Sequence, residues 1–418
     1  MSQKTVKTPV PEGAMGWSVL GEEEINAVTE LLRRPQNLFR VRPDGKESCC
    51  ERLEKNICNT TGAAHALFVA SGTGALSCCL TGFEIGPGDE VIVPAYTFIA
   101  TPAAVVDVGA VPVIAEIDDS LGLDPVDLEK KITPHTKAVI VVNMVGVPAR
   151  LTAIRNICKK HNLVLIEDCC QAIGATYKGK HVGVESDAFA WSTNFFKVIT
   201  CGEGGVFMTN NEKAFQRGVY QSDNGLNDVR QGHPANKNIK PFSRSGIRGN
   251  EIAAAVLDVQ VNKMGKMLAH TRMLKKRFFS QLEASANFKP QHVDDPEGDC
   301  GFCVNLIMND INKVETVIKL AEKEGLPLVK LYEAKLYEGG DLHVYSSWTP
   351  ILEKRSASPA GYPWKDPAYK GNVEYSTSMC PQTTDILGRT VRLLFNVNMT
   401  ETNIDEFAAA LNKIDKEL

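Results

Sequence analysis

The chain has 418 residues, of which 43% are hydrophobic and 23% charged, an ordinary balance for a globular protein that is too long for one simple core. A net charge of -4 gives no electrostatic case for binding nucleic acid, and no apolar run reaches the length of a membrane span. The N-terminus lacks the apolar core of a signal peptide, so we expect a two-lobed cytoplasmic protein without membrane or nucleic-acid partners.

The expected elements begin after an N-terminal arm of about 20 residues that is rich in Pro and Lys and that we expect to be flexible. Helical spacing comes first, at 22–34 and 51–58. Short aliphatic strands then alternate with amphipathic helices. The strands are 65–70, 90–94, 111–117, 138–142 and 163–168, and the helices begin near 71, 101, 125 and 151. This alternation predicts an α/β lobe with a mostly parallel sheet covered by helices on both faces.

The second half of the chain has a different pattern. A long helix near 251–284 is expected to link the lobes, and beyond it strands and helices are expected at 302–308, 312–324, 391–395 and 401–417. We therefore divide the chain into an N-terminal arm and helix (1–40), a large domain (41–265) and a smaller α+β domain (266–418). The stretch 334–383 is rich in Tyr, Trp, Pro and Ser and long for a loop, which suggests a substrate lid.

The twelve cysteines do not form a recognisable framework. Most lie beside aliphatic residues inside expected elements, which favours buried thiols in a reducing compartment over disulfides. The pair Cys300 and Cys303 is a lone CxxC with no second pair, so we expect no metal site. The glycine fingerprint of a dinucleotide-binding fold and the Walker A pattern are also absent from the sequence.

Lys197 lies in an apolar and aromatic stretch that is followed by a Gly-Glu-Gly-Gly turn. Apolar surroundings disfavour the ammonium form, and a Schiff-base lysine needs a free amine at neutral pH. The alternative is a lysine with a packed stem and a solvated head.

Further candidates fall at the carboxyl ends of expected strands, where α/β sheets bind ligands. Gly72 and Thr73 lie in a strand-to-helix turn that suits a phosphate, or is simply a capped turn. Phe98 is placed to stack on a planar cofactor, or is a core residue. Ser192 lies five residues before Lys197 and offers a hydroxyl to a phosphate.

Asp168 ends an aliphatic strand and Gln171 follows it closely. A buried carboxylate needs a charged partner, and the protonated nitrogen of a pyridine ring is one. The alternative is an aspartate that caps the next turn. A phosphate cradle, a stacking ring, a pyridinium partner and a Schiff-base lysine together indicate pyridoxal 5′-phosphate (PLP).

The same stretches resemble the nucleotide-sugar aminotransferases of the DegT/StrS family, within the fold-type I PLP-dependent enzymes. The matching runs are 71–76, 88–98, 109–112, 167–174 and 197–205. The resemblance implies that Lys197 holds PLP as a Schiff base, that Asp168 pairs with the ring nitrogen and that Phe98 stacks on the ring. It also implies that Gln171 lies near the 3-oxygen and that Gly72, Thr73 and Ser192 bind the phosphate.

The resemblance further implies a homodimer with its active site at the subunit boundary. In the family a Gly-x-Asn-x-Arg pattern supplies an asparagine to the partner's phosphate site. Here Arg248 and Glu251 match the pattern, but Gly246 stands where the asparagine is expected. Arg244 is our candidate for the missing contact, because guanidinium binds phosphate well.

The implied activity is transfer of an amino group from L-glutamate or L-glutamine to a keto or aldehyde sugar, as in amino sugar biosynthesis. Relatives with histidine in place of the lysine are dehydratases, so Lys197 favours transamination. The alternatives are another PLP reaction on the same fold (elimination, replacement or carbon–carbon bond chemistry) and, less favoured, a non-catalytic sensor.

Overall fold

The structure is a computed structural model that describes residues 4–34, 38–40, 45–223, 239–332 and 341–418. A seven-stranded sheet forms the centre of the large domain. In spatial order its strands are β1 (His65–Val69), β9 (Gly205–Thr209), β8 (Ala188–Ser192), β5 (Val164–Asp168), β4 (Thr136–Val142), β2 (Glu90–Pro94) and β3 (Val111–Ala115). The strands from β8 to β3 are parallel, and β9 runs antiparallel to both of its neighbours.

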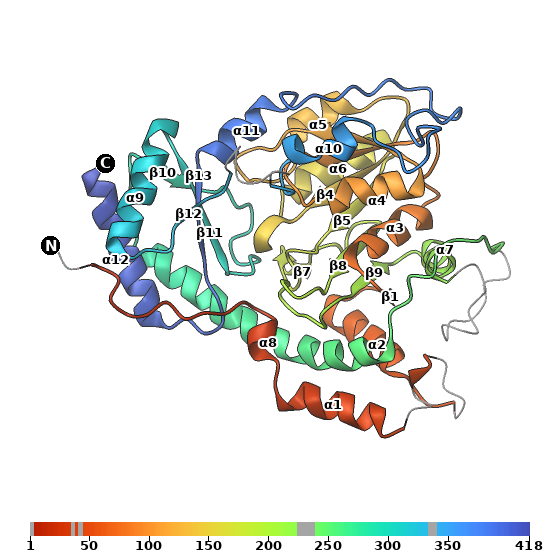
Figure 1. Ribbon diagram of the computed structural model, residues 1–418, viewed down its shortest axis with the longest axis horizontal. Helices are drawn as coiled ribbons and strands as arrows, with labels where there is room; N and C mark the ends of the chain where they lie inside the picture. Colours follow the sequence, from red (N-terminus) through yellow and green to blue (C-terminus); the bar gives the residue numbers. More distant parts are fainter. Residues whose placement is uncertain (1–3, 35–37, 41–44, 224–238, 333–340) are drawn as a thin grey trace.

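Helices cover both faces of this sheet (Figure 1). They are α2 (Cys49–Thr61), α3 (Gly72–Gly82), α4 (Ala100–Val108), α5 (Pro125–Lys131), α6 (Leu151–His161) and α7 (Glu212–Ser222). The helix α1 (Glu22–Leu32) lies outside this layer and packs on α8 (Glu251–Gln281). In β1, Leu67 and Val69 pack with α3 on one face, whereas Phe68 packs with α2 on the other. Because both faces of the strands are buried, their sequences are nearly continuous apolar runs. The predicted α/β fold with a mostly parallel sheet is confirmed.

The small domain is built on a four-stranded antiparallel sheet in the order β10 (Phe288–Pro290), β11 (Cys303–Met308), β13 (Thr390–Leu394) and β12 (Val329–Lys330). Its core also takes side chains from α9 (Val314–Glu324) and α12 (Glu401–Glu417). The long helix α8 (Glu251–Gln281) packs its first half into the large domain and Leu274 and Phe278 into the small one, so it bridges the two cores. The exact domain boundaries stay a prediction.

The remaining α-helices and β-strands are short. They are β6 (Thr176–Tyr177) and β7 (Lys180–His181), which pair with each other, and the helices α10 (Thr349–Leu352) and α11 (Pro381–Gly388). Among the described residues, no helix is long and apolar enough to cross a membrane.

The stretch 334–383, expected to be a substrate lid, lies outside the described residues up to 340. From 341 onward, Val344, Tyr345 and Trp348 pack into the core on the α3 face of the large sheet, and Trp348 is completely buried. These three side chains thus anchor the described beginning of the stretch in the core, and a role of the stretch as a substrate lid stays a prediction.

The N-terminal segment is held by specific contacts, in contrast to the expected flexible arm. The side-chain carboxylate of Glu324 accepts hydrogen bonds from the backbone and hydroxyl of Thr5 (3.0 and 2.6 Å), and Val6 is buried in the small-domain core. Asn396 donates to the carbonyl oxygen of Pro11 (2.9 Å). Figure 1 shows this segment in dark red, running from the small domain along α8 to α1.

Candidate active site

A cavity of about 310 Å³ is lined by residues of both domains and of the N-terminal segment. Residues 13–15 and 196–198 contribute to it, as do Val145 and Gln171 from the loops after β4 and β5. The small domain adds Phe302, Arg392 and residues 394–396. The loops after parallel strands meet at one edge of the sheet, so the cavity lies where such folds bind ligands.

Lys197 is half-buried in the turn that follows β8. Its backbone N–H donates to the carbonyl oxygen of Asn194 (3.1 Å), and its own carbonyl oxygen accepts from Gly16 (3.2 Å). The turn is therefore fixed on two sides, which holds the lysine Cα in place at the cavity that the residue lines.

Asp168 is buried at the carboxyl end of β5, as the sequence predicts. One carboxylate oxygen accepts from the hydroxyl of Thr101 (2.8 Å) and the other from the backbone N–H of Cys170 (3.0 Å). Burial raises the pKa of the Cys170 thiol, with a further rise from the Asp168 charge and an opposing effect from Lys197. Cys170 thus lies within electrostatic range of both charged residues, which places them around one site.

Gln171 lines the same cavity. Its side-chain oxygen accepts from the backbone N–H of Val145 (3.3 Å), which leaves the amide NH₂ group to donate to a ligand. Val145 has a left-handed backbone (φ 47°, ψ 39°), which is unusual for a β-branched residue. Strained backbone of this kind clusters at functional sites.

The predicted phosphate residues meet at the N-terminus of α3. Ser71 caps the helix by accepting from the N–H of Gly74 (3.0 Å), and Gly72 lies against the end of β8. A Cβ atom on Gly72 would lie 2.6 Å from the Cβ atom of Ser192, so only glycine fits there. Gly72, Thr73 and Ser192 are therefore together, with the positive end of the helix dipole.

Phe98 is 41% exposed and lies beside the cavity rather than in its lining. Its ring contacts that of His343 (centroids 5.2 Å apart, planes at 49°), and His343 does line the cavity. The Nδ1 atom of His343 lies 3.0 Å from a carboxylate oxygen of Asp341, which orients the imidazole.

Arg244 is not brought to this cavity within one chain. It is exposed and lines a hollow near Gly86 and Pro87, toward the other end of α3. Gly246 is also exposed. The role of Arg244 in a partner's phosphate site stays a prediction.

The two residues that match the family pattern near Gly246 have structural contacts in this chain. Arg248 pairs with the buried carboxylate of Asp223. Glu251 accepts from the backbone N–H groups of Cys49 and Cys50 (2.7 and 3.1 Å), where α2 begins. A carboxylate at a helix N-terminus is favourable, because the helix dipole is positive there.

Sequence reasoning missed Thr101, His343, Arg392 and residues 13–15. Arg392 carried a usable signal, because it is a charged residue within an apolar strand, Thr-Val-Arg-Leu-Leu. The others carried none, because nothing local places an N-terminal segment or a loop residue beside a distant lysine.

The residues present fit PLP. A buried, oriented carboxylate suits a protonated ring nitrogen, and the amine of Lys197 suits the aldehyde. The amide of Gln171 suits the ring oxygen, and the glycine-lined start of α3 with the Ser192 hydroxyl suits the phosphate.

Comparison with known proteins decides the family. Residues 19–339 match the profile of the DegT/DnrJ/EryC1/StrS aminotransferase family. The chain belongs to this family. Membership confirms the resemblance seen in the sequence and the prediction of a PLP-dependent aminotransferase.

Solved structures share the DegT/DnrJ/EryC1/StrS fold over almost the full chain. 3-Amino-5-hydroxybenzoic acid synthase is 24% identical, with a TM-score of 0.76 over 99% of this chain and 100% of that chain. The aminotransferase PseC from Helicobacter pylori is 21% identical, with a TM-score of 0.75 over 98% and 100% of the two chains. GDP-4-keto-6-deoxymannose-3-dehydratase is 18% identical, with a TM-score of 0.75 over 96% and 100%. Because a dehydratase shares this fold, the fold alone does not fix the reaction.

Proposed function

We propose that this member of the DegT/DnrJ/EryC1/StrS family transfers an amino group from L-glutamate or L-glutamine to a keto or aldehyde sugar, with Lys197 as its catalytic residue. The observation that carries the proposal is the shared cavity of Lys197 and Gln171, with Asp168 buried beside it and oriented by Thr101.

PLP, when bound, supplies an electrophilic aldehyde and a protonated ring that withdraws electrons from the donor's α-carbon. Asp168 keeps the ring nitrogen protonated, and Thr101 and the Cys170 N–H hold that carboxylate in place. Gln171 would donate to the ring oxygen. The N–H groups of Gly72 and Thr73 and the Ser192 hydroxyl would bind the phosphate.

Lys197 moves the protons of the reaction. Its amine removes the proton from the α-carbon of the donor and returns a proton to the sugar carbon that receives nitrogen. A lysine suits this general acid–base role when its surroundings leave the amine neutral. Phe98 and His343 enclose one side of the site.

We also propose a homodimer whose partner covers the surface beside Lys197. Phe195 and Phe196 are 47% and 79% exposed, and Phe195 stacks on Trp17 (centroids 5.9 Å apart, planes at 3°). An exposed aromatic cluster of this kind is typical of an interface. In the dimer, Arg244 of one subunit would reach the phosphate of the other.

A cytoplasmic location is likewise our proposal. All twelve cysteines are free thiols, and burial raises the pKa of most of them, as at Cys158, where the pKa rises to about 12. Buried, unreactive thiols are typical of proteins kept in a reducing compartment.

The proposal is tested by the absorbance spectrum of the purified protein before and after addition of L-glutamate, beside a Lys197→Ala variant. We expect a visible band of lysine-bound PLP that is bleached by L-glutamate with release of stoichiometric 2-oxoglutarate, and no such band in the variant. A band that ignores both L-glutamate and L-glutamine would favour elimination, replacement or carbon–carbon bond chemistry. A protein that binds no PLP would leave the non-catalytic sensor.

A further inference from the structure

Arg392 is a half-buried arginine in the lining of the Lys197 cavity. It projects from β13, the inner strand of the small-domain sheet between β11 and β12. Its Nε–H donates to the side-chain oxygen of Asn305 (2.8 Å) and its Nη2 to the hydroxyl oxygen of Tyr96 (2.8 Å). Both acceptors are neutral, so they orient the guanidinium without balancing its charge.

A chain of amides fixes this orientation. Asn305 donates through its NH₂ to the side-chain oxygen of Gln291 (2.7 Å), and Gln291 donates to the carbonyl oxygen of Ser120 (2.5 Å). Because the NH₂ groups of Asn305 and Gln291 both donate along this chain, the side-chain oxygen of Asn305 faces Arg392. Burial raises the pKa of Tyr96, so its phenol stays neutral beside the guanidinium.

Asp341, an acid that senses the Arg392 charge, is already engaged elsewhere. Burial alone would raise the pKa of Asp341, but hydrogen bonds from His343 and the charges of His343 and Arg392 lower it overall. Its carboxylate accepts from the backbone N–H of His343 (2.9 Å) and lies 3.0 Å from Nδ1 of the same residue. No ion pair joins Arg392 to a carboxylate of the described residues. The Cys303 side chain also interacts with the guanidinium, but burial raises the pKa of this thiol, so it adds no negative charge.

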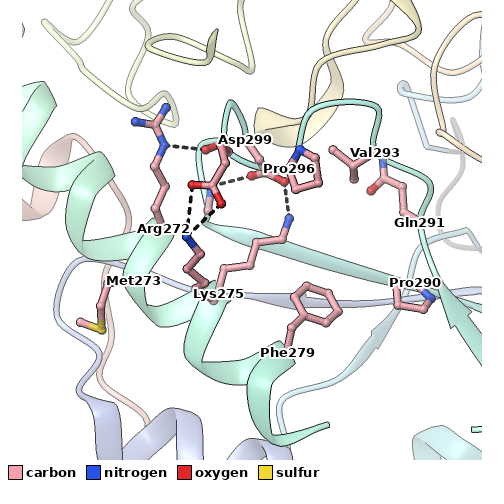
Figure 2. A pocket seen from close by; sticks show the side chains of 12 residues that line it. Arg272, Met273, Lys275, Phe279, Pro290, Gln291, Val293, Pro296 and Asp299 are labelled. Atoms are coloured by element: carbon pink, nitrogen blue, oxygen red, sulfur yellow. Dashed lines mark hydrogen bonds and ion pairs between the residues drawn. The ribbon is translucent and has the colours of Figure 1, made fainter. Parts of the chain in front are cut away.

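Several other partly buried cations of this protein have carboxylate partners. Lys263 pairs with Glu24 (2.8 Å) and Arg155 with Glu167 (3.0 Å). A second cavity, of about 560 Å³ between α8 and the loop 290–301, contains both kinds of cation. Lys275 pairs with Asp299, as Figure 2 shows, whereas the half-buried Arg272 donates to the carbonyl oxygens of Asp299 (2.6 Å) and Gly174 (3.0 Å). Arg392 differs from Arg272 because its acceptors are side chains and because it shares its cavity with Lys197.

We propose that Arg392 binds a carboxylate group of a substrate in the Lys197 cavity. A partly buried charge needs a counter-charge, and a guanidinium held by two neutral acceptors presents its remaining N–H groups to one. The donors that the proposed function places in this cavity, L-glutamate and L-glutamine, both carry a carboxylate. The inference rests on the proposed function and adds to it a substrate class: the donor amino acid, an acidic acceptor, or both.

The first experiment measures binding without turnover. 2-Oxoglutarate, which has no amine to react, is titrated calorimetrically into PLP-loaded wild-type protein and into Arg392→Gln, Arg392→Lys and the surface control Arg355→Gln. We expect Arg392→Gln to weaken binding by about 10- to 100-fold, since a hydrogen bond to a charged group contributes about 1.5–3 kcal/mol. Arg392→Lys should lose less affinity than Arg392→Gln, because lysine keeps the positive charge although it lacks the planar guanidinium group. Arg355→Gln should bind like wild type.

The second experiment addresses the acceptor. Enzyme that has taken nitrogen from L-glutamate is mixed with D-glucuronate or D-glucose, two aldehyde sugars that differ by one carboxylate, and the return of the original spectrum is timed. If the acceptor's carboxylate is the ligand, wild type prefers D-glucuronate and Arg392→Gln loses the preference. A loss in the first experiment alone assigns Arg392 to the donor.

The proposal is overturned if Arg392→Gln binds 2-oxoglutarate as wild type does and any preference between the two sugars is unchanged, or if wild type neither binds 2-oxoglutarate nor prefers the acid. A variant that keeps the PLP band and the melting temperature of wild type is not misfolded. Arg392→Lys provides a second variant in which the loss of binding can be measured. Failure of the proposed function gives a different result. In that case L-glutamate does not change the spectrum, but the binding of 2-oxoglutarate can still be measured and compared between wild type and Arg392→Gln.

Discussion

The backbone N–H of Gly16 donates a hydrogen bond to the carbonyl oxygen of Lys197 (3.2 Å), so the N-terminal segment closes the turn that carries the lysine. A Cβ atom on Gly16 would lie 2.9 Å from that oxygen and 3.0 Å from the backbone nitrogen of Thr200. Both neighbours are backbone atoms, so a side chain at residue 16 must displace either the segment or the turn.

Gly16→Val is therefore expected to disturb Lys197 from a distance. We expect a weaker PLP band and a fall in turnover of about 100-fold, the usual consequence of moving a catalytic group by about 1 Å. The control is Gly265→Ala in α8, where an added Cβ meets nothing within 4 Å. Equal turnover in the two variants would show that the segment does not position the lysine.

Thr101 is expected to matter through Asp168, whose carboxylate accepts its hydroxyl (2.8 Å). Thr101→Val removes a hydrogen bond to a charged group and keeps the shape, so we expect turnover to fall by about 10-fold with PLP still bound. Thr101→Ser keeps the hydroxyl and should restore most of the rate. A valine variant as active as wild type would mean that Asp168 needs no such support.

Gly72 tests the phosphate site. Gly72→Ala places a Cβ atom 2.6 Å from that of Ser192, whereas Gly86→Ala makes only an ordinary contact, 3.6 Å from the carbonyl oxygen of Val108. Titration of apoenzyme should show that Gly72→Ala loses affinity for PLP but not for pyridoxal, which lacks the phosphate. Parallel losses for both ligands would place the phosphate elsewhere.

Much of the large domain could be predicted because its signals are local. Strands β1, β2 and β5 are short apolar runs between turn residues, and the structure has them within one residue of the predicted bounds. The carboxylate of Asp168 at the end of β5 followed from the same pattern. Strand β8 was not predicted, because Ala-Phe-Ala-Trp-Ser lacks the run of Val, Ile and Leu that marks β2 and β5. Helix α7 was not predicted either.

The rest of the site depends on tertiary contacts that no local pattern records. Residues 13–15 reach the cavity because Glu324 and Asn396 hold the N-terminal segment on the small domain. His343 reaches the cavity because Trp348 and its neighbours are buried in the large-domain core. Composition alone suggested that this segment is a lid.

His181 is expected to make stability depend on pH. Its ring is buried beside Trp191 and Phe189, with Nδ1 2.6 Å from the carbonyl oxygen of Val182 and Nε2 3.3 Å from the backbone N–H of Gly174. The first contact requires a proton on Nδ1 and the second requires none on Nε2, so the neutral ring is fixed in one tautomer. Burial lowers the pKa of His181 from 6.5 to about 4.

The unfolded chain takes up a proton at this histidine as the pH falls below about 6.5, but the folded chain does so only near pH 4. The stabilisation is therefore complete above pH 6.5 and is lost as the pH falls toward 4; at pH 5 the loss is about 2 kcal/mol. His181→Gln cannot titrate, so its free energy of unfolding should fall less between pH 7 and pH 5 by about that amount. Denaturant unfolding of wild type, His181→Gln and the half-buried control His135→Gln measures this difference. An equal fall in wild type and His181→Gln would mean that the acid sensitivity arises from other groups.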